Sequence, residues 1–267
     1  MMKTLAVIFP VVTLLAILGV TVSGENPGKK HAKPLRALLI TGGCCHDYNK
    51  QKLIIPAGIS ERANVEWTVV HEGGTSRGHK VSIYAKPGWA EGYDVIVHNE
   101  CFGGVTDVGF IEAIAKVHKE GTPGVTLHCS THSYRNAKTD EWRKFLGVSS
   151  FNHGRHNPIE ITNTGKDHPV MRGFPDKWTT PQGELYNIEK VWPNTIELAV
   201  GKAGGKENLC VWVNQYGRGR MFGTTIGHHN ETMAEEVYLD LVARGLLWAC
   251  GKLGKDGKPL IGYAARQ

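Results

Sequence analysis

The sequence predicts an α/β fold with a mostly parallel central sheet and helices on both faces of that sheet. Four short apolar segments rich in β-branched residues have strand character, and they lie at 35–43, 64–72, 93–100 and 124–130. Two segments with helical spacing of apolar residues separate them, at 47–62 and 107–120, and Asp47 and Asp107 are suited to cap these helices. Because apolar strands that alternate with helices are buried on both sides, this order favours a parallel sheet between two helical layers.

The second half of the chain has a different pattern. Residues 145–195 form a long region of short strand-like stretches and extended loops, and we expect an irregular β/loop insertion there. Three further strands are expected at 195–201, 208–217 and 219–229, the last two joined by a hairpin at YGRGR. A final helix is expected at 231–250, where apolar residues form one broad face.

The first 24 residues have the pattern of a secretory signal peptide. One lysine precedes an apolar run that ends in small residues, with Val22 and Gly24 placed as residues before a cleavage site are. The alternative is an uncleaved N-terminal membrane anchor, since the apolar run is close to the shortest length that spans a bilayer. We expect a signal peptide at 1–24, a linker at 25–34, one domain at 35–253 and a polar C-terminal tail at 254–267. The mature protein is expected to be secreted or periplasmic, with no stable membrane span.

Composition narrows the classes of partner. Hydrophobic residues make up 41% of the chain, which is ordinary for a globular protein with a sizeable core. The net charge of +6 includes basic residues at both ends of the chain, and no dense basic stripe is interleaved with aromatic residues, so nucleic acid is not an expected partner. The six cysteines are widely spread and form no CxxC pair, which favours buried free thiols over a disulfide framework or a thiolate zinc site.

Polar residues gather directly after the predicted strands. Ligands of parallel α/β sheets bind beyond the carboxyl ends of the strands, so these residues are the candidates for a site. They are His46 and Asp47 after the first strand, His98, Asn99 and Glu100 at the third, His128 and His132 after the fourth, and His228, His229 and Glu231 after the last. A single histidine is at least as often structural as functional. The shared placement of several of the 13 histidines nevertheless favours a common site.

Three kinds of chemistry could use such a group. A metal site would draw its ligands from six residues, although no HExxH pair fixes their spacing: His46, His128, His132, His153, Glu184 and His228. A thiol nucleophile would be Cys129 on a strained turn, but small residues do not flank it, and a structural buried thiol is the favoured interpretation. Metal-free acid–base catalysis would pair a histidine with Glu100 or Glu184.

Aromatic residues beside the strand-end loops indicate a class of ligand. Seven of them lie in or next to these loops rather than within apolar strands: Tyr48, Trp89, Phe102, Tyr134, Trp142, Trp178 and Tyr186. Flat faces with neighbouring amides and hydroxyls suit a sugar ring, although each residue taken singly could instead anchor its own loop.

Five motifs follow one another between about residues 35 and 253. They are GGCCHDY, GVTLHCSTHSY, DHPVMRGFPDKW followed by GELYNI, YGRGRMFGTTIGHH, and LVARGLLWACGK. In these motifs and their order the chain resembles the ThuA-like (trehalose utilisation) family, within the class I glutamine amidotransferase-like superfamily. The resemblance implies a flavodoxin-like three-layer sandwich and a role in carbohydrate metabolism, on keto-sugars or their glycosides.

The resemblance also points to individual residues. Family motifs are matched by His46 and Asp47, by His128, Cys129 and His132, by Glu184 and Tyr186, and by His228. Four positions depart from the family pattern: Cys44 and Cys45 replace the more usual residues before His46, and Gly183 and His229 stand where acidic residues are usual. The change at His229 would make the site more neutral. His128 falls where true amidotransferases carry their nucleophilic cysteine, which argues against glutaminase chemistry.

These observations lead to one leading hypothesis and two alternatives. The leading hypothesis is a secreted enzyme, a hydrolase or a lyase or isomerase, that acts on a carbohydrate by metal-assisted or His/Glu acid–base chemistry. The alternatives are a non-catalytic sugar-binding or accessory module and an amide or ester hydrolase that depends on Cys129. The expected partner is a small carbohydrate, a homo-oligomer is left open, and no nucleotide cofactor is expected.

The leading hypothesis assigns roles to the candidate residues. Catalysis is assigned to His128, His132 and Glu184; substrate binding to His46, Asp47, Tyr48, Glu100, Tyr134, Tyr186 and His229; and ligation of a divalent metal, zinc or similar, to His46, His128 and His228.

Overall fold

The computed structural model describes Met2 and residues 32–266. The predicted signal peptide, apart from Met2, and residues 25–31 of the predicted linker therefore lie outside the described residues. Within the described part, no helix combines the length and the apolar character that crossing a bilayer requires.

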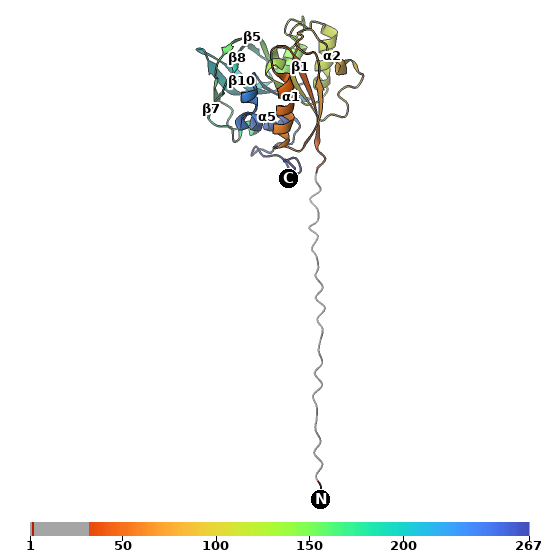
Figure 1. The fold of residues 1–267 in the computed structure, drawn as a ribbon, viewed down its shortest axis with the longest axis vertical. Helices are drawn as coiled ribbons and strands as arrows, with labels where there is room; N and C mark the ends of the chain where they lie inside the picture. The colour runs from red at the N-terminus through yellow and green to blue at the C-terminus, as the bar shows by residue number, and fades with distance from the viewer. Residues whose placement is uncertain (1, 3–31, 267) are drawn as a thin grey trace. The chain divides into compact units, whose positions relative to one another are not determined.

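A nine-stranded sheet forms the centre of the domain (Figure 1), in the order β2-β1-β3-β4-β11-β10-β9-β6-β7. Its strands are β1 (Leu35–Gly43), β2 (Val65–His71), β3 (Val95–Cys101), β4 (Gly124–Leu127), β6 (Glu160–Asn163), β7 (Lys177–Thr179), β9 (Thr195–Ala203), β10 (Lys206–Tyr216) and β11 (Gly219–Thr224). Neighbours from β2 to β11 in this order pair in parallel, and those from β11 to β7 pair antiparallel. The predicted α/β class is confirmed, and the parallel half is the part that the alternation of strands and helices predicted.

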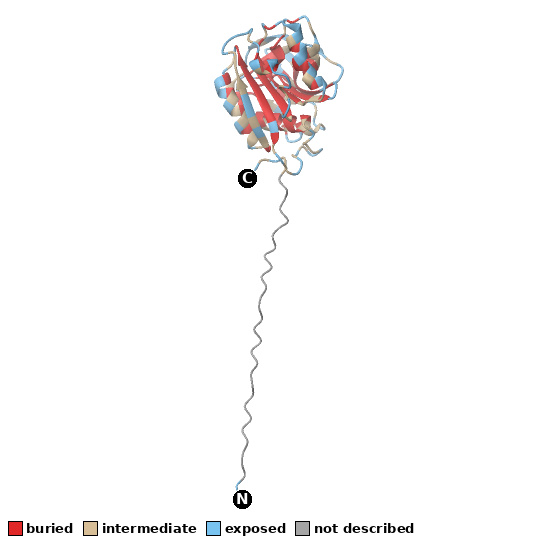
Figure 2. Ribbon diagram, turned by 90° about the vertical axis from the view of Figure 1, so that its right-hand side faces the viewer, coloured by how far each residue is buried: buried red, intermediate tan, exposed pale blue. Residues whose placement is uncertain are grey.

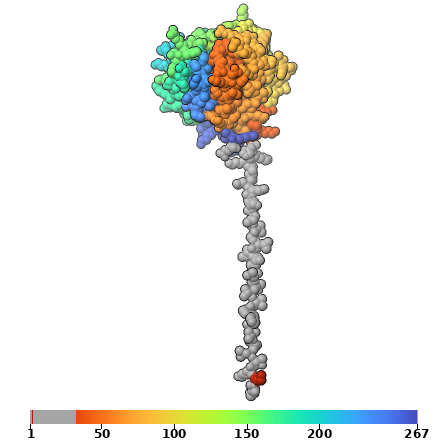
Figure 3. Space-filling view, in the orientation of Figure 1, coloured from red at the N-terminus to blue at the C-terminus, as the bar shows by residue number. Residues whose placement is uncertain are grey.

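Helices cover both faces of the sheet, as predicted. On one face, Leu39 of β1 packs in a cluster with α1 (Tyr48–Ser60) and α5 (Glu236–Ala249). On the other, Leu38 and Ile40 pack in a cluster with α2 (Val108–Lys119) and α3 (Glu141–Leu146). Figure 2 shows the resulting buried strands between more exposed helices, and Figure 3 shows α1 beside α5 on the first face. This is the three-layer sandwich that the sequence predicts.

The expected helix caps are present, and one expected helix is divided. Asp47 and Asp107 accept hydrogen bonds from the backbone N–H groups of Lys50 and Phe110, at 3.2 and 3.1 Å, and so begin α1 and α2. The single helix expected at 231–250 is instead α4 (Asn230–Met233) followed by α5. Glu235 has an extended backbone between them and serves as the N-cap of α5.

The irregular insertion has its own strands. β5 (Val148–His156) and β8 (Glu184–Val191) form a separate antiparallel pair, in which His153 lies opposite Tyr186 and His156 lies opposite Glu184. Three 3₁₀ turns complete the fold: η1 (Ser82–Ala85), η2 (His128–His132) and η3 (Pro169–Met171). The pairing of β5 with β8 therefore places two histidines of the insertion beside its glutamate.

The polar C-terminal tail lies against the start of the sheet. The backbone N–H of Asn64 donates to the Tyr263 carbonyl at 2.9 Å, and its side-chain amide donates to the Gly262 carbonyl at 3.0 Å. A backbone bridge joins Ala63 to Ala264.

Candidate active site

Three histidines meet at the carboxyl end of the parallel half of the sheet. His46 follows β1, His128 follows β4 and His228 follows β11. The ring centroid of His46 lies 4.4 Å from that of His228 and 4.9 Å from that of His128. Side chains up to 182 residues apart in sequence thus lie close together, because the carboxyl ends of parallel strands lie at one edge of the sheet.

The insertion adds a carboxylate to these histidines. Glu184, at the start of β8, places Oε2 3.4 Å from Nε2 of His128 and Oε1 3.8 Å from Nε2 of His228. One ligand atom from each of His46, His128, Glu184 and His228 lies within 4.8 Å of the other three. We call these four residues the His3Glu group.

The backbone fixes which nitrogen of His128 faces the group. His128 has a φ of +41°, in the left-handed region, where the chain turns from β4 into η2. Its Nδ1 lies 2.6 Å from the Thr225 carbonyl, which can only accept a hydrogen bond, so Nδ1 carries the proton. Nε2 is then left with a lone pair that faces the Glu184 carboxylate. Two acceptors at this distance need a proton or a cation between them.

His46 and His228 also have nitrogens free to bind. Nδ1 of His46 lies 3.3 Å from the Cys44 carbonyl and 3.1 Å from the Tyr48 hydroxyl, while its Nε2 is buried without a hydrogen-bond partner among the described residues. Nδ1 of His228 is likewise buried and without such a partner, whereas the nitrogen of His228 that faces Glu184 is Nε2. Buried polar atoms are rarely left unpaired, so Nε2 of His46 fits a ligand that the side chains themselves do not supply.

Burial sets the charge of the group. Burial lowers the pKa of His46 to about 2 and that of His228 to about 3, so both imidazoles are neutral at pH 7. Burial opposes ionisation of Glu184, but its contacts with the surrounding histidines, His128 first, lower the pKa of this carboxyl to about 2. His46 and His228 therefore offer neutral imidazole nitrogens beside the Glu184 carboxylate.

A second layer of side chains holds the group in place. His132 stacks on Tyr186, with ring centroids 3.8 Å apart, and its Nε2 lies 2.9 Å from the Ser150 hydroxyl. The Tyr186 hydroxyl lies 3.2 Å from Nε2 of His128. His132, which the sequence assigns to catalysis, and Tyr186, which it assigns to substrate binding, therefore both lie beside the His3Glu group.

The insertion also brings His153 and His156 to the site. Their ring nitrogens lie 3.0 and 2.9 Å from Oε1 of Glu184. His153 is among the predicted metal candidates, whereas His156 is not among the residues that sequence reasoning selected. Positions three apart on a regular strand point to opposite faces, and an irregularity of β5 between these two residues lets both reach one carboxylate.

The structure does not bring every predicted substrate-binding residue into the cavity. Asp47 is exposed and caps α1, and Tyr134 packs in the apolar cluster against α2 and α3. Glu100 is fully buried and binds His98, with 2.9 Å between Oε1 and Nδ1. Tyr48 lies behind His46, and His229 lies beside His228 with ring centroids 4.4 Å apart.

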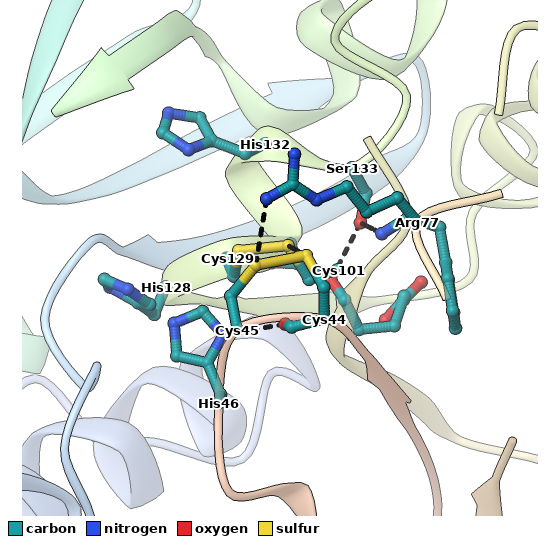
Figure 4. Close-up of a disulfide and its surroundings, with 12 residues drawn as sticks. Cys44, Cys45, His46, Arg77, Cys101, His128, Cys129, His132 and Ser133 are labelled. Carbon is teal, nitrogen blue, oxygen red and sulfur yellow. Dashed lines mark hydrogen bonds between the residues drawn. A yellow bond between two sulfur atoms is a disulfide. The ribbon is translucent and has the colours of Figure 1, made fainter. Parts of the chain in front are cut away.

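The expectation of free thiols is wrong for four of the six cysteines. Cys44 and Cys45 form one disulfide, and Cys101 and Cys129 form another, while Cys210 and Cys250 are free. Figure 4 shows the four sulfur atoms side by side, and the Sγ atoms of Cys44 and Cys101 are 3.8 Å apart. The wide spacing in sequence hides this contact, because the four cysteines follow three neighbouring strands at the same edge. Since Cys129 has no free thiol, a Cys129-dependent hydrolase is not supported.

One cavity of about 160 Å³ opens onto these groups. It is lined by His46, His132, His153, Glu184, Tyr186 and His228, by the four disulfide cysteines, and by Arg77, Gly103, Gly104, Arg135 and Asn136. The two arginines were not among the predicted site residues. Arg77 comes from the loop after β2, and no strand-end pattern marks it. Arg135, by contrast, directly follows the GVTLHCSTHSY motif.

Comparisons with known proteins agree with the resemblance in sequence. The family model described as "ThuA: Trehalose utilisation" matches residues 37–249. None of the curated proteins matches the chain. A solved ThuA-like protein from Parabacteroides merdae is 20% identical, with a TM-score of 0.67, over 88% of this chain and 98% of its own. One from Bacteroides uniformis is 14% identical, with a TM-score of 0.61, over 83% and 95%. At these identities, the solved structures show a shared fold.

Proposed function

The chain belongs to the ThuA family, and from this premise we propose that it is a metal-dependent enzyme acting on a sugar, keto-sugar or glycoside. The observation that carries the proposal is the convergence of the His3Glu group beside a cavity that His46, Glu184 and His228 line, with His128 buried behind them. The family's description as trehalose utilisation supports a carbohydrate as the substrate class.

The donor set fits a divalent first-row cation. Imidazole nitrogen and carboxylate oxygen are the common ligands of Zn²⁺, and Mn²⁺, Fe²⁺ or Ni²⁺ accept the same set. Metal–ligand distances of about 2.1 Å in a tetrahedral site place ligand atoms roughly 3.4 Å apart. The ligand atoms here lie within 4.8 Å of one another, so small side-chain movements close the site. The carbonyls of Thr225 and Cys44 hold the Nδ1 protons of His128 and His46, which leaves Nε2 of each to bind.

The residues around the group supply the remaining chemistry. A divalent cation held by the His3Glu group would supply a Lewis acid for a carbonyl or hydroxyl oxygen of the substrate. Burial raises the pKa of Tyr186 well above its ordinary value, so its hydroxyl stays protonated and can donate a hydrogen bond toward the group. His153 is 40% exposed and lines the cavity, where it can exchange a proton between substrate and solvent. His132 holds the Tyr186 ring by stacking.

We also propose that the protein works outside the cytosol. The disulfides Cys44–Cys45 and Cys101–Cys129 support this, because such bonds persist in oxidising compartments.

Metal content and turnover test the proposed enzyme together. Purified protein grown in metal-replete medium should contain about one zinc, manganese, iron or nickel ion per chain by elemental analysis, and His128→Ala should lose it. His71→Ala, which removes a histidine from β2 outside the group, is the matched control and should keep the metal. Turnover of a panel of glycosides and keto-sugars should disappear after chelation and return with metal.

Two results would reject parts of this proposal. Equal turnover before and after chelation would remove the metal from the mechanism and favour His/Glu acid–base catalysis. Sugar-induced thermal stabilisation without product from any member of the panel would favour a non-catalytic sugar-binding module.

A further inference from the structure

Two arginines line the cavity without a carboxylate partner. Arg77 extends from the loop between β2 and η1, and Arg135 from the loop after η2. Within residues 32–266, no aspartate or glutamate oxygen lies within 4.0 Å of either guanidinium, although most other arginines of this part form ion pairs. A guanidinium has five N–H donors. Arg135 uses one on the Phe151 carbonyl at 2.9 Å, and Arg77 has only a 4.0 Å contact with Sγ of Cys45.

Two glycines let both arginine-bearing loops approach the loop after β3. A Cβ atom on Gly103 would lie 3.0 Å from the His132 carbonyl oxygen and 3.4 Å from Nε of Arg135. A Cβ atom on Gly104 would lie 3.0 Å from the Arg77 carbonyl oxygen, which already accepts a 2.8 Å hydrogen bond from the Gly104 N–H. A side chain at either position would press on the backbone of an arginine-bearing loop and shift it by a few tenths of an ångström, so glycine favours this close approach.

The wall beneath Arg77 does not neutralise its charge. Figure 4 shows the Arg77 guanidinium over the sulfur atoms of the two disulfides. Disulfide sulfurs are weakly polar, so they support the guanidinium without competing for its donors. The sole acidic residue of the cavity lining is Glu184, whose oxygens already face the histidines His128, His153 and His156. The cavity therefore has a surplus of positive charge and unused N–H donors.

We propose that the site binds a carbohydrate that carries an anionic group, and that Arg77 and Arg135 bind this group while the sugar ring faces the His3Glu group. Guanidinium forks match oxyanions in geometry and charge, and this holds for a carboxylate as in a uronic acid and for a sulfate or phosphate ester. A cavity of roughly 150 Å³ holds one benzene ring, so the cavity of about 160 Å³ is of a size to receive one ring of a sugar at a time. This inference rests on the proposed function and names its substrate class.

Calorimetric titration of the metal-loaded protein tests the inference with four probes: glucose, glucuronate, glucose 6-sulfate and glucose 6-phosphate. At least one anionic probe should bind about tenfold or more tightly than glucose, and its identity distinguishes carboxylate from ester. Arg77→Gln and Arg135→Gln should each lower the affinity for that probe by about tenfold and leave the affinity for glucose unchanged. The control is Arg218→Gln, because Arg218 is exposed in the β10–β11 turn and also has no carboxylate partner within 4.0 Å among residues 32–266.

The outcomes separate this inference from the proposed function. Equal binding of all four probes, or an equal loss of affinity in Arg218→Gln, would overturn the anionic substrate. The anionic substrate would also be overturned if an anionic probe bound no more tightly than glucose after chelation but still bound more tightly than glucose in both arginine variants. The anion would then bind the metal rather than the arginines. If the proposed metal-binding function is wrong, elemental analysis of the same samples will show no bound metal, whichever probe binds.

Discussion

The protein contains two groups built from histidine and glutamate, and they differ in what their polar atoms contact. Three of the four residues of the His3Glu group line the cavity, and the group holds buried nitrogens that have no partner among the described residues. The second, which we call the core His–Glu group, consists of His98, Glu100 and His118 between β3 and α2. In it, Nε2 of His98 lies 3.0 Å from Nε2 of His118, whose Nδ1 lies 2.9 Å from the Thr122 carbonyl.

The difference shows that residue type alone does not make a site. All three members of the core His–Glu group are 0–1% exposed, and the described cavities do not reach them. Its members bind one another, the Thr122 carbonyl and the Tyr84 hydroxyl, which lies 2.8 Å from Oε1 of Glu100, and Oε2 of Glu100 is the one polar atom of this group left without a partner among the described residues. We infer that the core His–Glu group stabilises the fold, whereas the His3Glu group is arranged for a ligand. The following changes should separate the two groups, from the largest expected effect to the smallest.

Glu100→Ala should give the largest loss of stability. It leaves His98 buried without its partner, and breaking a buried pair of this kind costs about 3–5 kcal/mol. Chemical denaturation should show this loss, while the fraction that folds keeps its metal stoichiometry. A fully stable Glu100→Ala protein that had lost its metal would show instead that the core His–Glu group serves the site.

Glu184→Gln should have the opposite profile. The amide keeps the shape of the side chain but removes the carboxylate charge from the His3Glu group, so we expect metal affinity to fall by about 100-fold. Competition against a fluorescent zinc chelator measures this fall, and denaturation of the metal-free variant should show a smaller loss of stability than that of Glu100→Ala, because Glu184 lies at the cavity and Glu100 in the core. An unchanged zinc affinity would exclude Glu184 as a ligand.

Acidification should destabilise the metal-free protein through both groups. Burial lowers the pKa of His46 to about 2 and lowers that of His118 well below its ordinary value, whereas both titrate near 6.5 in the unfolded chain. Below pH 6.5 the unfolded state therefore binds protons that the folded state does not, and the free energy of unfolding falls. Each such histidine contributes about 1.4 kcal/mol per pH unit.

Denaturation curves between pH 7.5 and 5 measure this dependence, and saturating zinc distinguishes the two groups. Zinc should stabilise the wild type at pH 7.5 and lose this effect as the pH falls, because its ligands must be deprotonated. In His118→Gln the zinc effect should remain, since His118 belongs to the core His–Glu group. Stability that rose on acidification would contradict the buried neutral histidines.

His156→Ala should have the smallest effect. Its half-exposed side chain places Nε2 2.9 Å from Oε1 of Glu184, where it is a hydrogen-bond partner of a proposed metal ligand. Loss of such a partner weakens metal binding by about tenfold. The same chelator competition measures it, with Asn152→Ala on the same strand as the control. A loss equal to that of Glu184→Gln would make His156 a ligand itself.

The parallel half of the fold and its histidines could be predicted from sequence, because strand ends are visible as polar residues after apolar runs. His46, His128 and His228 were identified in this way. The same rule misplaced Glu100, since the end of a strand in sequence does not show which face its side chain takes. Ile96, His98 and Glu100 alternate along β3 toward α2, and that places Glu100 under a helix.

The insertion and the disulfides depend on contacts that no local pattern shows. His156 reaches Glu184 because β5 pairs with β8 through an irregular register, across 28 residues. Cys101 meets Cys129 because β3 and β4 are neighbours, and the arginines reach the cavity from loops that carry no periodic signal. Spatial neighbours of this kind follow from topology, which the sequence pattern predicts only in outline.

X-ray absorption at the zinc edge of zinc-loaded protein tests the central claim most directly. The His3Glu group predicts nitrogen and oxygen neighbours at about 2.0–2.1 Å, with the outer-shell scattering of imidazole rings that is absent in His128→Ala. Sulfur neighbours at about 2.3 Å would contradict this account, because they would place the metal on the cysteines of the cavity wall instead.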